Sequence, residues 1–146
     1  MSRVMLLANG SPGVEIVKFL SNLQDTEIVA LYLCGNDNVY HNKIISLLDD
    51  NKKIHSAEDF ESAAHLKYLD SLDIDILITV YWPYLLKEEV FNKAQKTINM
   101  HPSLLPINRG WYPHVHSLID GSKAGVTLHS IDKNADTGAI WAQKEI

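Results

Sequence analysis

Two continuous apolar runs near the start of the chain constrain its fold most strongly. Residues 4–8 (Val-Met-Leu-Leu-Ala) and 28–33 (Ile-Val-Ala-Leu-Tyr-Leu) show no polar alternation, as is typical of strands that are covered on both faces. Between them, apolar residues recur at helical spacing from Val14 to Leu23. Because parallel strands need a crossover connection of this kind, residues 1–33 predict one βαβ unit.

The remaining apolar segments extend this pattern into a larger sheet. Further strands are predicted at residues 53–55, 74–80, 96–100, 126–129 and 139–142. The run 74–80 is the most apolar and is expected to be central. The order of elements predicts an α/β fold, a doubly wound, mostly parallel Rossmann-like sheet with a C-terminal antiparallel strand pair.

Two more helices are predicted from their start signals. Ser56-Ala57-Glu58-Asp59 has the spacing of a capping box, with Asp in place of the usual Glu, and should start a helix that runs to about Leu72. Pro113 suits the first turn of another helix. Its apolar residues Val115, Leu118 and Ile119 are expected to form a buried stripe.

Composition limits the class of protein. The chain has 146 residues, 46% of them apolar, which is enough for one soluble domain with an ordinary core. Its 13 Lys and Arg against 18 Asp and Glu give a net charge of −5 without a basic cluster, so nucleic acid is not predicted as a partner. Neither a signal peptide nor a membrane span is predicted, and the expected location is the cytoplasm.

The turn Asn9-Gly10-Ser11-Pro12-Gly13 lies where phosphates bind helix N-termini in βαβ units. It lacks the third glycine of the dinucleotide-binding motif, and no acidic residue closes the second strand. A nicotinamide dehydrogenase is therefore not predicted. Two interpretations of Gly10 and Gly13 stay open: a tight strand-to-helix turn without a ligand, or contact with a phosphate or a substrate.

Two loops that follow predicted strands carry candidate site residues. Tyr81-Trp82-Pro83-Tyr84-Leu85 follows the strand 74–80, where ligands bind in open α/β sheets; its aromatic rings suit a flat heterocycle, or they cap the core. Asn99-Met100-His101-Pro102 ends the next strand. Asn99 and His101 should project to the same side because alternate side chains of a strand share a face. From this motif alone, a surface loop with an incidental His remains an alternative.

The other histidines do not predict a metal site. His41, His55 and His65 have no ligand-type residue that we recognise as a partner, so we interpret them as surface or satisfied side chains. His114 and His116 are two residues apart, and this spacing on a helix directs them to different faces. The single cysteine, Cys34, cannot form an internal disulfide, and no zinc-type spacing is present.

Four sequence blocks in one order carry a family resemblance. They are Asn99-Met-His-Pro-Ser-Leu-Leu-Pro106, Arg109-Gly110, Gly125-Val-Thr-Leu-His129 and Asp136-Thr-Gly138. Together they closely resemble the signature of the formyltransferases that use 10-formyltetrahydrofolate. The match covers about residues 74 to 143, and the N-terminal βαβ unit is compatible with the fold that this family implies.

The resemblance implies roles by position. Asn99, His101 and Asp136 match the catalytic Asn, His and Asp of the family. An amine would attack the formyl carbon, and an Asn amide and an imidazolium would stabilise the charge that develops on the oxygen. His101 would also relay a proton, and Asp136 would orient its ring. The resemblance implies 10-formyltetrahydrofolate as co-substrate, no metal, and folate contacts from Val80, Tyr81, Trp82, Leu85, Asp132 and Ala135.

The residues after Arg109-Gly110 bear on the acceptor. Trp111 and Tyr112 resemble those of formyltransferases for amino sugars on nucleotide carriers, so we predict a nucleotide-linked amino sugar and assign Gly10, Ser11, Arg109, Trp111 and Tyr112 to its binding. The alternatives are a methionyl-tRNA or glycinamide ribonucleotide formyltransferase, a formyltetrahydrofolate hydrolase, and a folate-binding module without catalysis. The oligomeric state stays open, including a homodimer.

The length also differs from that of relatives. The sequence ends at Ile146, inside a predicted strand, whereas relatives continue with further elements. We therefore expect residues 1–146 to form one formyltransferase catalytic domain that lacks the C-terminal segment usual in the family.

Overall fold

A computed structural model of the chain describes residues 1–36, 38–107, 109, 113–134 and 136–146. Its strands are β1 (Ser2–Ala8), β2 (Thr26–Leu33), β3 (Ile54–Ser56), β4 (Ile74–Val80), β5 (Ala94–His101), β6 (Gly125–His129) and β7 (Ile140–Glu145). Its α-helices are α1 (Gly10–Ser21), α2 (Asn38–Ser46), α3 (Ala63–Asp70), α4 (Glu88–Phe91) and α5 (Pro113–Asp120), and its 3₁₀ helices are η1 (Asn51–Lys53) and η2 (Ala57–Glu61).

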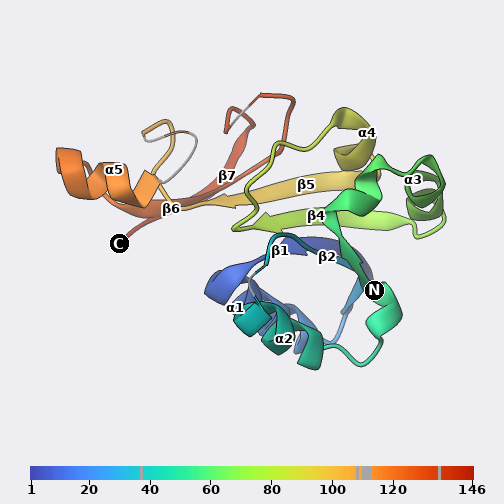
Figure 1. The fold of residues 1–146 in the computed structure, drawn as a ribbon. Helices are drawn as coiled ribbons and strands as arrows, with labels where there is room; N and C mark the ends of the chain where they lie inside the picture. The colour runs from blue at the N-terminus through green and yellow to red at the C-terminus, as the bar shows by residue number, and fades with distance from the viewer. Residues whose placement is uncertain (37, 108, 110–112, 135) are drawn as a thin grey trace.

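The seven strands form one sheet in the order β3-β2-β1-β4-β5-β6-β7 (Figure 1). The pairs from β3 to β5 are parallel, and β6 pairs antiparallel with both β5 and β7. The predicted fold class is therefore confirmed. The chain winds outward from β1 to β3, then returns to place β4 on the other side of β1, so the topological switch point lies between β1 and β4.

Side chains of β1 alternate between two hydrophobic cores. Val4, Leu6 and Ala8 belong to the core under α1 and α2, whereas Met5 and Leu7 belong to the core that contains residues of η2, α3 and α4. Figure 1 shows α1 and α2 on one side of the sheet and α3 and α4 on the other. Burial on both faces explains why the β1 sequence is continuously apolar.

Two helix predictions need correction. The helix after β1 begins at Gly10 and not at Val14, so the glycine turn is its first turn. The capping box forms, with the Asp59 Oδ2 atom accepting the Ser56 N–H at 3.0 Å, but the segment it starts is the 3₁₀ helix η2. A separate N-cap at Ser62 then starts α3, because its side chain accepts a hydrogen bond from the His65 N–H.

The predicted buried stripe of α5 is also wrong. Val115, Leu118 and Ile119 are 39%, 85% and 79% exposed, and they belong to neither hydrophobic core. The physical reason is position, since α5 lies at the end of the molecule beyond the two core layers (Figure 1).

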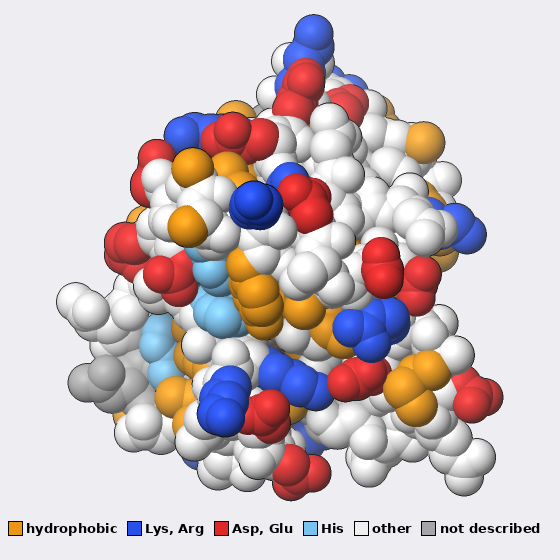
Figure 2. All heavy atoms as spheres, turned by 90° about the vertical axis from the view of Figure 1, so that its right-hand side faces the viewer, with side chains coloured by type: hydrophobic (Ala, Val, Ile, Leu, Met, Phe, Trp, Pro, Cys, Tyr) orange, Lys and Arg blue, Asp and Glu red, His pale blue; other side chains and the backbone are white. Residues whose placement is uncertain are grey.

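Charged side chains of both signs lie interspersed on the face at the α3 end of the molecule, where imidazole rings also reach the surface (Figure 2).

Within the described part of the chain, no helix has the length and apolar character that crossing a bilayer requires.

Candidate active site

Four polar side chains meet where β5, β6 and the loop before β7 come together. The Asp136 Oδ1 atom lies 3.4 Å from the Nδ1 atom of His101 and 3.5 Å from the Nε2 atom of His129. The Asn99 Nδ2 atom lies 3.0 Å from the same His129 nitrogen. The network joins all three residues that the resemblance designates as catalytic and adds His129.

The register of the antiparallel pair explains this meeting. Asn99 lies opposite His129, and His101 lies opposite Thr127, so alternate residues of β5 bring Asn99 and His101 to the same neighbourhood. His101 and His129 are only 4% and 2% exposed. The Asp136 side chain, 11% exposed, lies between these two imidazoles. The two rings can therefore compensate the charge of the buried carboxylate.

Thr79 of β4 orients the Asn99 amide. The Thr79 hydroxyl donates to the Asn99 Oδ1 atom at 2.6 Å, which turns the Nδ2 group toward His129. Thr79 is 4% exposed and pairs with Asn99 in the parallel register. Adjacent strands thus fix one amide at both of its ends.

The loop after β6 brings Asp136 back to the sheet. The Asp132 carboxylate accepts a hydrogen bond from the Asn134 N–H at 2.9 Å and from the Thr137 hydroxyl at 2.8 Å, which closes the loop on itself. Asp136 has φ +55°, a left-handed conformation that Asp tolerates better than most residues. A Cβ atom on Gly138 would lie 1.7 Å from the Ser130 carbonyl oxygen, so only glycine fits there.

His129 faces two partners with opposite demands on its Nε2 atom. The Asn99 amide needs a lone pair there, whereas the Asp136 carboxylate favours a proton. Burial lowers the pKa of His129, but the hydrogen bond to Asp136, the Ser130 carbonyl bonded to Nδ1 and the negative charges of Asp136 and Asp132 outweigh it and raise the pKa overall. Protonation of His129 therefore strengthens its tie to Asp136 and weakens its acceptance from Asn99.

This raised pKa predicts how stability changes with pH. Below pH 6.5, the pKa of His129 in the unfolded chain, the imidazole is protonated in both the folded and the unfolded state, and its contribution to stability is fully present. This contribution is lost as the pH rises through the higher pKa of the folded state. The free energy of unfolding of the wild type minus that of His129→Gln should fall with rising pH, as measured by urea denaturation from acid to alkaline buffers.

His55 provides a control of opposite sign. Burial and the neighbouring His65 lower its pKa, despite the opposing effect of Asp59. The contribution of His55 to stability is therefore fully present above pH 6.5, the pKa of its unfolded state, and is lost as the pH falls through the lower pKa of the folded state. The free energy of unfolding of the wild type minus that of His55→Gln should therefore rise with pH. A difference that rises with pH for His129, or one that falls with pH for His55, would contradict the corresponding assignment.

Thr127 anchors the loop that follows His101. Its side chain is fully buried, and its hydroxyl donates to the Ser103 carbonyl at 2.7 Å. The same oxygen accepts the Leu105 N–H at 3.0 Å and the Gln143 amide at 2.9 Å. One hydroxyl therefore joins β6, β7 and the loop after β5.

Replacing this hydroxyl by a methyl group should be costly. In Thr127→Val, the buried Ser103 carbonyl and Leu105 N–H lose their partner, and we expect the free energy of unfolding to fall by about 3 kcal/mol. Thr26→Val, at the partly exposed start of β2, should change it by less than about 0.5 kcal/mol. Urea denaturation measures both. Equal effects of the two variants would mean that Thr127 does not anchor the loop.

Comparison with known proteins assigns the family. The family model described as formyl transferase matches residues 4–146. The chain belongs to the formyl transferase family. A Mycobacterium bovis protein named dTDP-4-amino-4,6-dideoxyglucose formyltransferase is 54% identical over 50 residues, which are 34% of this chain and 21% of that protein. The chain thus matches only a short part of that relative.

Solved structures of formyl transferases have the same fold. A sugar N-formyltransferase from a Shewanella species aligns with a TM-score of 0.76 and 25% identity over 100% of this chain and 57% of its own. A phosphoribosylglycinamide formyltransferase from Bacillus halodurans aligns with a TM-score of 0.77 and 20% identity over 99% of this chain and 79% of its own.

The residues assigned to folate take different positions in this formyl transferase. Val80 is buried, Tyr81 and Leu85 are 58% and 68% exposed, and Trp82 packs partly buried against the core that includes Met5. For Trp82 the core-capping interpretation thus matches the packing. The Asp132 carboxylate shapes its own loop, and Ala135 lies outside the described residues.

The residues assigned to the acceptor are spread more widely. Gly10, with φ +64°, lies under the Tyr81 ring, where an added Cβ would be 3.0 Å from the ring. Ser11 lines a groove of about 310 Å³ between α1 and α2. Arg109 is exposed, and Trp111 and Tyr112 lie outside the described residues.

Sequence reasoning missed Asn9, which joins three strands at the switch point. Its Oδ1 atom accepts the Cys34 N–H and lies 3.1 Å from the His41 Nε2 atom, and its Nδ2 atom donates to the Cys34 Sγ atom at 3.0 Å. Its own N–H donates to the Val80 carbonyl. A single polar residue directly after a buried apolar strand was the available signal.

Proposed function

We propose that this chain is the catalytic domain of an N-formyltransferase that moves the formyl group of 10-formyltetrahydrofolate to the amine of a nucleotide-linked amino sugar. The observation that carries the reaction is the buried network of Asn99, His101, His129 and Asp136, in a chain of the formyl transferase family.

The reaction needs stabilisation of charge on the formyl oxygen. When the amine attacks the formyl carbon, its carbonyl becomes a tetrahedral centre with a negatively charged oxygen. The Asn99 Nδ2 group has two N–H bonds, one of which faces His129, and the second would donate to this oxygen. Thr79 and His129 hold the amide before the reaction, so little reorganisation is required.

The reaction also needs a proton to pass between two nitrogens. The attacking amine loses a proton, and the departing folate nitrogen gains one. His101 turns its Nδ1 atom toward Asp136, so its Nε2 atom would exchange the proton with the substrate. Asp136 would keep the ring in this orientation during both transfers.

The choice of an amino sugar rests on two observations of different kinds. The relative that is 54% identical over 50 residues is named for a dTDP-linked amino sugar. The residues after Arg109 include Trp111 and Tyr112, whose rings would stack on a base or a sugar. The net charge of −5 does not favour a tRNA acceptor.

Mass spectrometry of acceptors tests this function. The chain is incubated with 10-formyltetrahydrofolate and a panel of nucleotide-linked amino sugars, with glycinamide ribonucleotide and methionyl-tRNA as competing acceptors. Gain of one formyl group by a sugar, lost in His101→Ala, is the expected result. Formylation of glycinamide ribonucleotide alone would overturn the acceptor, and release of formate without any acceptor would indicate a hydrolase.

A further inference from the structure

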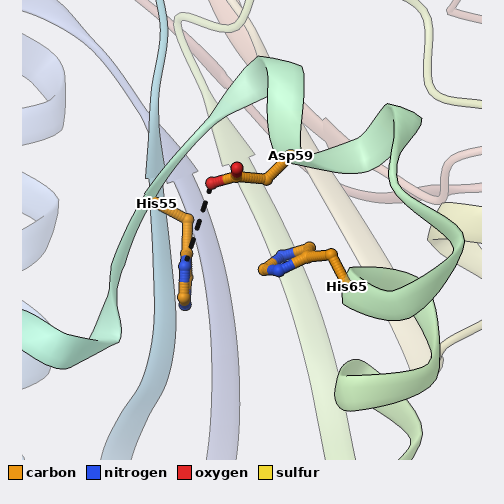
Figure 3. A group of neighbouring side chains, drawn as sticks. All are labelled: His55, Asp59 and His65. Atoms are coloured by element: carbon orange, nitrogen blue, oxygen red, sulfur yellow. Dashed lines mark ion pairs between the residues drawn. The ribbon is translucent and has the colours of Figure 1, made fainter.

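Three metal-ligand side chains converge at the β3 edge of the sheet. His55 comes from β3, Asp59 from η2 and His65 from α3, and one ligand atom of each lies within 4.8 Å of the other two (Figure 3). The prediction that His55 and His65 lack ligand-type neighbours is therefore wrong. The spacing alone did not show it because the chain turns twice, at the starts of η2 and α3, within ten residues.

This cluster is separate from the candidate active site. Strands β2, β1 and β4 lie between β3 and β5, and four strand spacings correspond to about 19 Å. The formyl transfer mechanism uses none of its three residues.

His55 has the character of a metal ligand. Its Nε2 atom is buried and makes no hydrogen bond with the described residues, and its Nδ1 atom lies 4.0 Å from the Asp59 Oδ2 atom. The Nδ1 atom is thus the His55 nitrogen that faces Asp59 (Figure 3), and Asp59 and His65 supply the other two ligand atoms of the cluster.

Outer contacts orient the other two side chains. The His65 Nε2 atom lies 2.6 Å from the Tyr32 hydroxyl, and the Tyr32 ring stacks on Phe60 with centroids 4.3 Å apart. The Asp59 Oδ2 atom accepts the Ser56 N–H at 3.0 Å. Such contacts typically fix the ligands of metal sites.

We propose that His55, Asp59 and His65 bind a divalent transition-metal ion, such as Zn²⁺, with water completing the coordination. Two imidazoles and one carboxylate form a nitrogen and oxygen donor set that suits zinc and cobalt. Ligand atoms of a tetrahedral zinc site lie about 3.4 Å apart, so the ion would draw these side chains together by about 1 Å. The bound ion would tie the edge strand β3 to η2 and α3.

Titration of the metal-stripped chain with Co²⁺ tests the proposal. We expect one site with the visible absorption of tetrahedral cobalt, displaced by Zn²⁺, and a rise in melting temperature of about 5 °C at saturating Zn²⁺. His55→Gln and Asp59→Asn should each weaken binding at least about 100-fold, and Tyr32→Phe by about 10-fold through loss of the outer contact. Circular dichroism shows whether each variant folds.

A control separates this site from the other His and Asp cluster of the chain. His101→Ala should leave cobalt binding unchanged, because His101 lies at β5. Loss of the cobalt spectrum in His101→Ala but not in folded His55→Gln and Asp59→Asn would overturn the proposal. Absence of any saturable site in the folded wild type would also overturn it.

Discussion

Replacing His101 by alanine is expected to lower kcat/KM for formyl transfer by about 1,000-fold, within the range that general acid–base groups contribute. The imidazole is 4% exposed and its Nδ1 atom is held by Asp136, so no described neighbour stands in the same position to take over proton transfer. Steady-state assays with 10-formyltetrahydrofolate and the formylated acceptor measure the effect.

Substitutions of His101 and Asp136 are expected to reduce kcat/KM non-additively, because the two side chains are in contact. Asp136→Asn should reduce kcat/KM by about 100-fold, because the ring loses its orienting carboxylate while its Nε2 atom is retained. The double variant should be no worse than His101→Ala alone, since the carboxylate acts through the imidazole. Asp70→Asn, an exposed carboxylate paired with Lys93, is the matched control and should leave kcat/KM unchanged. Multiplicative losses in the double variant would mean that Asp136 also acts independently of His101, through its contact with His129.

The strands could be predicted because the apolar residues of each segment indicate that it is buried. β1 and β2 are covered on both faces and carry continuous apolar runs, and β4 is apolar except at Asp75 and Thr79. Helix boundaries could not be predicted as well, because more than one polar residue of this segment can serve as an N-cap. The Ser62 hydroxyl starts a second helix after η2, which splits the single helix expected from periodicity.

The candidate site could be predicted only in part, because some of its contacts are local in sequence and others are not. Asn99 and His101 are two apart on one strand, so their proximity follows from local geometry. His129 enters only through the β5–β6 register, and a register is not visible in either strand alone. Family blocks include His129 in the sequence, but its contact with the Asn99 amide requires the fold.

The Asn99 amide carries the second large prediction. Asn99→Ala should lower kcat by about 100- to 1,000-fold, as expected for loss of one oxyanion donor. Because the charge on the formyl oxygen develops only in the transition state, KM should change little. A variant that raises KM at unchanged kcat would instead mean that Asn99 binds the ground state.

Thr79 provides the test of how that amide is positioned. Without the hydroxyl that donates to the Asn99 Oδ1 atom at 2.6 Å, the amide loses the contact that fixes which end faces His129. Thr79→Val should therefore lower kcat by about 10-fold, the equivalent of one hydrogen bond. Thr79→Ser keeps the hydroxyl and should restore kcat. If serine failed to restore kcat while the fold was retained, the methyl group and not the hydroxyl would be the part of Thr79 that matters, and the Asn99 amide would be oriented by His129 alone.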